Sequence, residues 1–109
     1  MDEIGRRLRK FRDERDWAQF HTPQKLAISI ALEAAELLEI FQWGDGSSAL
    51  TSDQTSRASS EVADILIYLI YFCDKAKIDL LKATRDKISQ NELRYPITES
   101  KGVAGRDRD

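Results

Sequence analysis

Two pairs of acidic residues stand three positions apart within apolar segments: Glu33 with Glu36, and Glu61 with Asp64. On a helix, residues at i and i+3 project from neighbouring points of one face. Each pair lies on an apolar stripe of its own helix. The stripe that includes Glu33 is formed by Leu26, Ile30, Leu37 and Phe41, and the stripe that includes Glu61 is formed by Ile65, Tyr68 and Phe72. Four carboxylates between two such stripes need cations. Because every ligand is an oxygen, the pattern predicts a site for one or more Mg²⁺ ions between two helices.

Two other interpretations of the acids are less favourable. A single Glu-x-x-Glu pair is usually a solvated helix face, but two pairs on apolar stripes favour a metal, because buried acids rarely lack a partner. A di-iron carboxylate bundle would use Glu-x-x-His pairs, and the one histidine, His21, has no such spacing. Glu39 lies well round the helix from Glu33 and is predicted to be a surface or salt-bridge residue.

Cationic and polar side chains recur near the end of the last predicted helix. Lys87, Asn91 and Arg94 share one face, and Tyr95 follows. They form either an ordinary polar exterior or, beside a magnesium site, the charge-neutralising groups that a polyphosphate needs. Tyr68, one turn beyond Asp64, places its hydroxyl either on a phosphate or in the core.

Four aromatic residues flank the first acidic helix, namely Trp17, Phe20, His21 and Trp43. Such residues usually belong to a core. They are also the kind of side chains that hold a nucleobase by stacking and one polar hydrogen bond.

Helix signals divide the chain into four long segments. The first helix is predicted over about residues 2–16, and the second over 23–43, with Thr22 as N-cap, Pro23 in the first turn and glycines after its end. The third is predicted from a cap at Ser52 or Asp53 to about residue 75. The fourth is capped by Asp79 and ends near residue 94, before Pro96. The fold class is therefore all-α and four-helix-bundle-like, with one domain over 1–97 and a disordered polar tail over 98–109.

Composition excludes several classes of protein. The chain has 109 residues, and its 17 basic and 19 acidic side chains are mixed along it, which argues against a nucleic-acid-binding surface. One cysteine, Cys73, gives no disulfide framework. The N-terminus lacks an apolar signal core, and the longest apolar run, 65–73, is too short to span a bilayer. We expect a cytoplasmic protein with no membrane or nucleic-acid partner.

The apolar run 65–73 also predicts self-association. A helix that is apolar around its whole circumference must be surrounded on all sides. Three partner helices in so small a chain are too few to cover it, so part of its surface is expected to meet another subunit.

Four segments in order, residues 11–23, 33–43, 61–69 and 87–96, resemble the MazG-like all-α nucleoside triphosphate pyrophosphohydrolases. The shared pattern is ExxE, a spacer, ExxD, and a Lys/Asn/Arg run on the next helix. The resemblance is closest to the dCTP pyrophosphatase branch and covers nearly all of residues 5–97.

The resemblance implies hydrolysis of a nucleoside triphosphate between its α- and β-phosphates, in a homotetramer built as a dimer of dimers. By position it implies three groups of residues: Mg²⁺ ligands (Glu33, Glu36, Glu61, Asp64), phosphate contacts (Tyr68, Lys87, Asn91, Arg94, Tyr95) and a base site (Trp17, Phe20, His21, Trp43). Of these, Glu33, Glu36, Lys87 and Arg94 are the expected catalytic residues, and Glu36 is our choice for the group that deprotonates water. Leu8 stands where some dCTP enzymes have a base-contacting histidine, so a broader or modified-base substrate range is plausible.

Two other functions remain open at this point. One is a non-catalytic helical module that binds nucleotides or a protein partner. The other is a related pyrophosphatase of different base preference, such as a dUTP-hydrolysing enzyme.

Overall fold

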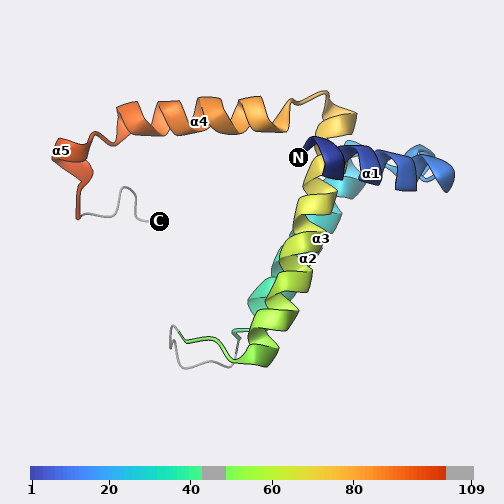
Figure 1. The fold of residues 1–109 in the computed structure, drawn as a ribbon, viewed down its shortest axis with the longest axis horizontal. Helices are drawn as coiled ribbons and strands as arrows, with labels where there is room; N and C mark the ends of the chain where they lie inside the picture. The colour runs from blue at the N-terminus through green and yellow to red at the C-terminus, as the bar shows by residue number, and fades with distance from the viewer. Residues whose placement is uncertain (43–48, 103–109) are drawn as a thin grey trace. The chain divides into compact units, whose positions relative to one another are not determined.

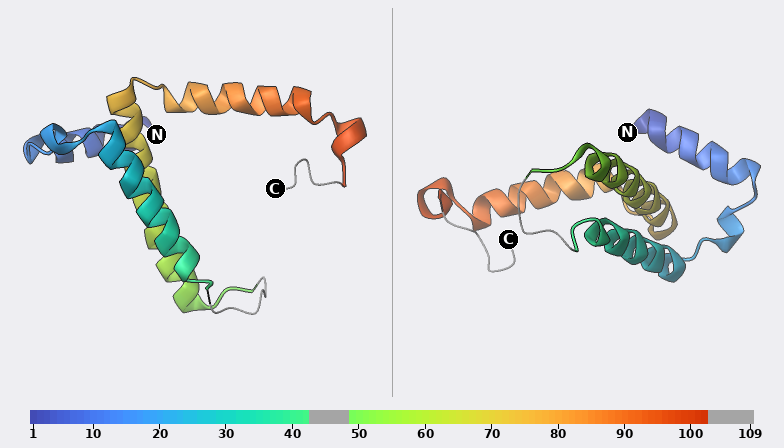
Figure 2. Two further views of the ribbon diagram at one scale, coloured as in Figure 1. Left: turned by 180° about the vertical axis from the view of Figure 1, so that it is seen from behind. Right: turned by 90° about the horizontal axis from the view of Figure 1, so that it is seen from below.

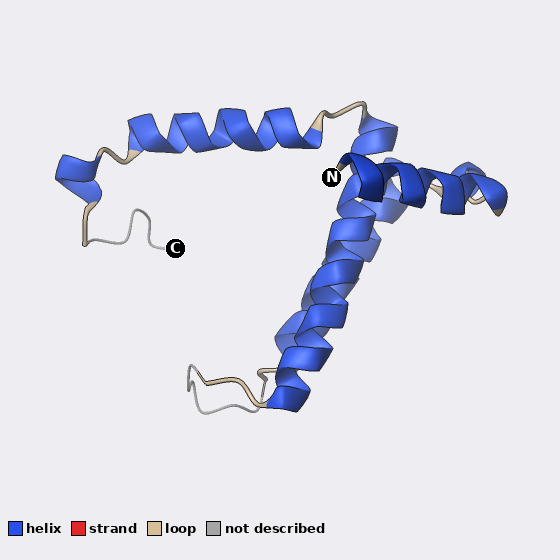
Figure 3. Ribbon diagram, viewed as in Figure 1, coloured by secondary structure: helices blue, strands red, loops and turns tan. Residues whose placement is uncertain are grey.

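Helices are the only regular elements among residues 1–42 and 49–102, which are the residues that the computed structural model describes (Figure 1, Figure 3). The predicted all-α class is confirmed, with no strand in those ranges. The chain divides into two compact units, residues 1–77 and residues 78–109. The elements are α1 (Asp2–Glu14), a short 3₁₀ helix (Ala18–Phe20), α2 (Pro23–Glu39), α3 (Ser52–Ala76), α4 (Leu80–Arg94) and α5 (Ile97–Ser100).

Two helix starts lie where the sequence predicts them. The Thr22 hydroxyl oxygen accepts a hydrogen bond from the backbone N–H of Lys25 at 3.1 Å, and Pro23 opens α2. The Asp79 carboxylate accepts one from the N–H of Lys82 at 3.0 Å. Both caps satisfy N–H groups that the first turn of a helix leaves unpaired.

The cap of α3 is Thr51, so the predicted cap at Ser52 or Asp53 is wrong by one or two residues. The Thr51 hydroxyl accepts from the N–H of Gln54, and the Gln54 side chain accepts from the N–H of Thr51, each at 3.0 Å. This reciprocal pair is a capping box, which the pattern Thr-x-x-Gln specifies better than a single polar residue does.

Other boundaries also differ from the prediction. The first helix ends at Glu14 rather than near residue 16, and α2 ends at Glu39 rather than near residue 43. The predicted stop at the glycines that follow Trp43 lies outside the described residues. Helix α5 occupies the start of the predicted tail, and residues 103–109 are also outside the described part.

Helices α2 and α3 lie side by side and run in opposite directions, as Figures 1 and 2 both show. The core of the first unit is small and forms mainly between them. Its buried residues are Leu26, Ile40, Ile70, Tyr71 and Cys73. This antiparallel helical pair is the frame on which both acidic pairs are mounted.

Polar contacts fasten α1 to the second half of α3. The Tyr71 hydroxyl donates to the carbonyl of Leu8 at 2.9 Å. Asp74 accepts from two arginines of α1, Arg9 at 3.3 Å and Arg12 at 3.2 Å. Only 12% of the Arg12 side chain is exposed, and its charge is balanced by Asp74 and by Asp13, whose carboxylate accepts from Arg12 at 2.9 Å.

Replacing Asp74 with Asn is expected to lower the free energy of unfolding by about 1–3 kcal/mol, because partly buried Arg12 loses a charged hydrogen-bond partner. Urea unfolding measures the change. Asp86→Asn is the matched control, since the Lys82–Asp86 pair is well exposed and should contribute under about 1 kcal/mol. Equal losses in the two variants would contradict the role of Asp74.

Much of the apolar surface remains accessible. Within 65–73 only Ile70, Tyr71 and Cys73 are buried, and the other side chains are half-buried. None of the described helices combines the length and the apolar character that crossing a membrane requires.

Candidate functional site

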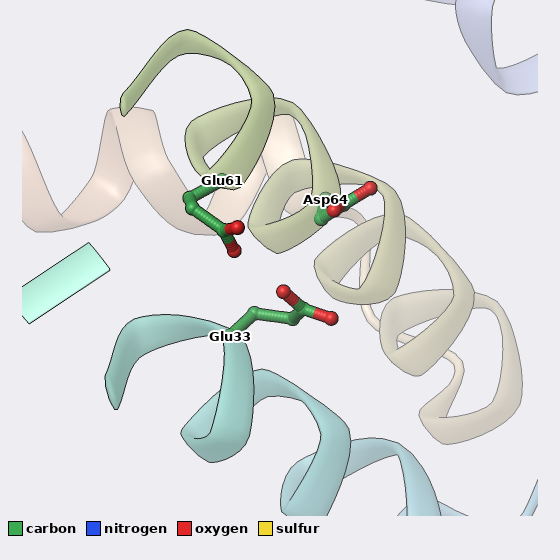
Figure 4. A group of neighbouring side chains, drawn as sticks. All are labelled: Glu33, Glu61 and Asp64. Atoms are coloured by element: carbon green, nitrogen blue, oxygen red, sulfur yellow. The ribbon is translucent and has the colours of Figure 1, made fainter. Parts of the chain in front are cut away.

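Three of the four predicted metal ligands converge between α2 and α3. Glu33 projects from α2 toward Glu61 and Asp64, which project from α3 (Figure 4). Each residue offers one carboxylate oxygen, and these three atoms lie within 4.8 Å of one another. The i, i+3 spacing on α3 and the antiparallel pairing of the helices together produce this arrangement.

The charges of this three-acid group are not balanced within the first unit as described. The Oε2 atoms of Glu33 and Glu61 are buried and have no hydrogen-bond partner. A protonated Glu33 can donate a hydrogen bond to Glu61 or Glu36, and this effect, together with desolvation and charge repulsion, raises the pKa of Glu33 to about 7. Converging oxygen ligands that repel one another fit a hard divalent cation, and the group could bind a metal ion.

Glu36 lies at the edge of this arrangement. It is not a member of the three-acid group, but its carboxylate is close enough to Glu33 to raise the pKa of that residue. Glu36 is also exposed, whereas Glu33 is half-buried. The geometry therefore gives Glu36 a more accessible position than the three grouped acids.

A polar pocket of about 400 Å³ adjoins the acids, and we call it the α2–α3 pocket. Its lining includes residues from the last turns of α2 and the first turns of α3: Glu36, Glu39, Ile40, Arg57, Ser60 and Glu61. Glu39 is exposed, in agreement with the prediction, yet it lines this pocket. Arg57 and Ser60 are not among the residues that the sequence predicts for a site. The spacing of four places Arg57 on the same face of α3 as Glu61, but nothing in the spacing shows that this face lines a pocket.

The predicted phosphate contacts are divided between the two units. Tyr68 is half-buried on α3, one turn beyond Asp64. Lys87, Asn91, Arg94 and Tyr95 belong to the second unit, where the Arg94 guanidinium lies 5.4 Å from the centre of the Tyr95 ring. The Tyr95 hydroxyl is buried without a hydrogen-bond partner. Their contact with a phosphate stays a prediction.

Two of the four residues predicted for the base site, Trp17 and His21, make ring contacts with α1 and α3 in the described structure. Trp17 packs edge-on against Phe11 with 5.4 Å between ring centroids, and His21 lies 4.8 Å from Tyr71. Burial, with the charges of nearby cations, lowers the pKa of His21, and its Nδ1 atom is buried without a partner. Phe20 is 60% exposed. Trp43, the fourth member, lies outside the described residues, so a base site formed by this set stays a prediction.

The raised pKa of Glu33 predicts how the metal-free protein responds to pH. Its ordinary value is 4.5 and its value in the folded chain is about 7, so the folded state binds this proton more tightly than the unfolded state. Stability should therefore fall as pH rises through that interval and should be lowest above it.

Thermal unfolding in a metal chelator at about pH 5 and about pH 8 measures this effect. Glu33→Gln is the matched control, since it removes the titrating group and retains every other group, including His21. The decrease in Tm with pH should be larger in the native chain than in the variant. Parallel curves would contradict the prediction.

Comparisons with known proteins agree with the resemblance seen in the sequence. Residues 28–109 match the model of the MazG-like family. The chain is 36% identical to dCTP pyrophosphatase 1 of Bos taurus, over 95% of this chain and 64% of that protein. It is 35% identical to dCTP pyrophosphatase 1 of Homo sapiens, over 88% of this chain and 59% of that protein. The chain thus spans about six tenths of the length of these curated relatives.

One solved structure matches this chain over most of the length of both proteins. The crystal structure of a pyrophosphatase from Archaeoglobus fulgidus DSM 4304 is 43% identical in sequence and superposes with a TM-score of 0.76, over 88% of this chain and 92% of that chain. The family model covers three quarters of the sequence and includes all four acids of the ExxE and ExxD pairs. This chain belongs to the MazG-like family.

Proposed function

We propose that this protein is a Mg²⁺-dependent pyrophosphohydrolase that converts a nucleoside triphosphate into a monophosphate and pyrophosphate. The substrate we favour is dCTP or a modified dCTP, and the role is removal of unwanted nucleotides. The observation that carries the proposal is the convergence of Glu33, Glu61 and Asp64, with two buried carboxylate oxygens left unpaired. Similarity to proteins named dCTP pyrophosphatase supports the reaction and the base.

The donor set determines which ion the site would take. Glu33, Glu61 and Asp64, with Glu36 beside them, offer only carboxylate oxygens, which suit Mg²⁺ better than softer metals. Bound there, Mg²⁺ supplies charge neutralisation for the phosphates and a lower pKa for a coordinated water. No histidine or cysteine belongs to the three-acid group.

Glu36 is the residue we assign to proton transfer. In the proposed reaction, the oxygen of a water molecule forms a bond to the α-phosphorus as Glu36 accepts the proton of that water. The bond between the α-phosphorus and the oxygen bridging to the β-phosphorus breaks, and pyrophosphate leaves with the electron pair of that bond. The position of Glu36 at the exposed edge of the acidic group supports its assignment to proton transfer.

The remaining predicted residues have binding roles in this proposal. Lys87 and Arg94 neutralise charge that develops on the departing pyrophosphate, while Tyr68, Asn91 and Tyr95 hold phosphate oxygens. The aromatics Trp17, Phe20, His21 and Trp43 contact the base.

A homotetramer in the cytoplasm is part of the same proposal. Large apolar side chains on the outer surface of α2 support self-association, since Ile28, Leu32 and Leu38 are 52%, 61% and 70% exposed. The single cysteine, Cys73, is a buried free thiol, which is compatible with a reducing compartment. Light scattering of the purified chain measures the number of subunits.

The decisive experiment is pyrophosphate release from a panel of dNTPs and NTPs that includes 5-methyl-dCTP, with and without Mg²⁺. We expect Mg²⁺-dependent release of pyrophosphate with a monophosphate product, fastest with cytosine bases. If another base is preferred, the proposed substrate is wrong and the proposed reaction stands. No release from the folded protein would overturn the proposed activity and favour a nucleotide-binding module.

A further inference from the structure

The α2–α3 pocket contains one positive charge among its lining residues. Glu36, Glu39 and Glu61 line it with Ser60, and Arg57 is the cation in that set. The pocket shares Glu61 with the three-acid group, so the pocket lies directly beside the carboxylates of that group.

Arg57 is positioned by α3 to reach the same ligand as Glu61. The two residues are four positions apart, which places them one turn apart on one face of the helix. Because α3 begins at Ser52 with a capping box, the backbone at Arg57 is a regular, well-anchored helix. The backbone that carries the Arg57 guanidinium is therefore held in a fixed position next to the acids.

No strong interaction within the described chain occupies the Arg57 guanidinium. Its ion pair is with Asp53, at 3.8 Å, and the two side chains are 57% and 80% exposed. Exposed pairs of this length contribute little to stability. The guanidinium is thus available to an oxyanion, for which its planar, five-donor geometry is well suited.

Electrostatics explains why a cation is needed at this point. A polyphosphate bound beside three carboxylates meets repulsion wherever its oxygens extend beyond the metal site. We propose that Arg57 binds the phosphate farthest from the scissile bond, and thereby favours nucleoside triphosphates over diphosphates. This inference rests on the proposed function, and it adds a residue that determines the length of the phosphate chain.

The test compares dCTP with dCDP as substrates of the native protein, Arg57→Ala and Arg57→Lys. We expect Arg57→Ala to raise KM for dCTP by about 10- to 100-fold, the loss typical of a charged hydrogen bond. KM for dCDP should change little, so the preference for dCTP over dCDP should shrink. Arg57→Lys should restore part of it. Arg6→Ala is the matched control, because Arg6 is exposed on α1 and is not among the residues that line the pocket.

The outcomes separate this inference from the proposed function. If the native protein releases pyrophosphate and Arg57→Ala retains the native preference for dCTP, the role of Arg57 is wrong and the function stands. The same holds if dCTP and dCDP are affected equally, or if Arg57→Ala only lowers Tm, since Arg57 would then be a counter-ion of the acids.

If the native protein is inactive, the proposed function fails and calorimetry with Mg²⁺ and α,β-methylene-dCTP still tests Arg57. Weaker binding by Arg57→Ala would support the contact. Equal affinities, or no binding by either protein, would overturn it.

Discussion

Replacing Glu36 with Gln is expected to lower kcat by about 10²- to 10⁴-fold, the usual contribution of a general base. Gln retains the size of the side chain and cannot accept the proton of water. Because Glu36 is exposed and lies outside the three-acid group, we expect the variant to retain the rise in Tm that Mg²⁺ produces. Pyrophosphate release and thermal unfolding with and without Mg²⁺ measure the two properties.

Glu39→Gln is the matched control for this variant, since Glu39 follows one turn later on α2 and lines the same pocket. It should change kcat much less than Glu36→Gln. Retention of substantial activity by Glu36→Gln would remove Glu36 from proton transfer. Loss of both activity and the Mg²⁺ effect would instead make Glu36 a metal ligand, as the four-acid pattern of the sequence predicts.

Replacing Glu61 with Gln is expected to have opposite effects on the metal-free and the Mg²⁺-loaded protein. The metal-free variant should be more stable than the native chain above about pH 7, because one of the repelling carboxylates beside Glu33 is gone. Mg²⁺ should no longer raise Tm, and activity should fall by about 100-fold or more, since the site loses a ligand and the charge that retains the ion.

Glu92→Gln serves as the control for Glu61→Gln, since Glu92 is exposed on α4 in the second unit. It should leave both Tm and the Mg²⁺ effect unchanged. A Glu61→Gln protein that Mg²⁺ still stabilises fully would show that the ion binds elsewhere. A metal-free variant less stable than the native chain would show that Glu61 has a structural role.

Local signals in the sequence determined most of what could be predicted. Thr22, Pro23 and Asp79 define helix starts because a cap depends on residues within one turn. The acids at 33, 61 and 64 could be paired because i, i+3 spacing and apolar stripes fix which face each residue occupies. Once two adjacent helices pair in antiparallel fashion, few other arrangements of these residues are possible.

Features that depend on packing were harder to predict. The glycines that follow residue 43 predict that α2 continues to that point, yet the helix ends at Glu39. Glu39 is exposed as its angle relative to Glu33 predicts, but that angle says nothing of the residues of α3 with which Glu39 lines the pocket. A helical wheel describes one helix at a time, so the contribution of Arg57 to the pocket could not be seen in it.

Mounting Glu33, Glu61 and Asp64 on neighbouring antiparallel helices has a kinetic consequence. The acids are fewer than 35 positions apart along the chain, so bringing them together closes a loop of modest length. The entropy of loop closure grows only slowly with length, and contacts of low sequence separation generally form fast. The three-acid group should therefore assemble as soon as α2 and α3 dock, and in a refolding reaction an ion that this group binds should bind at that step.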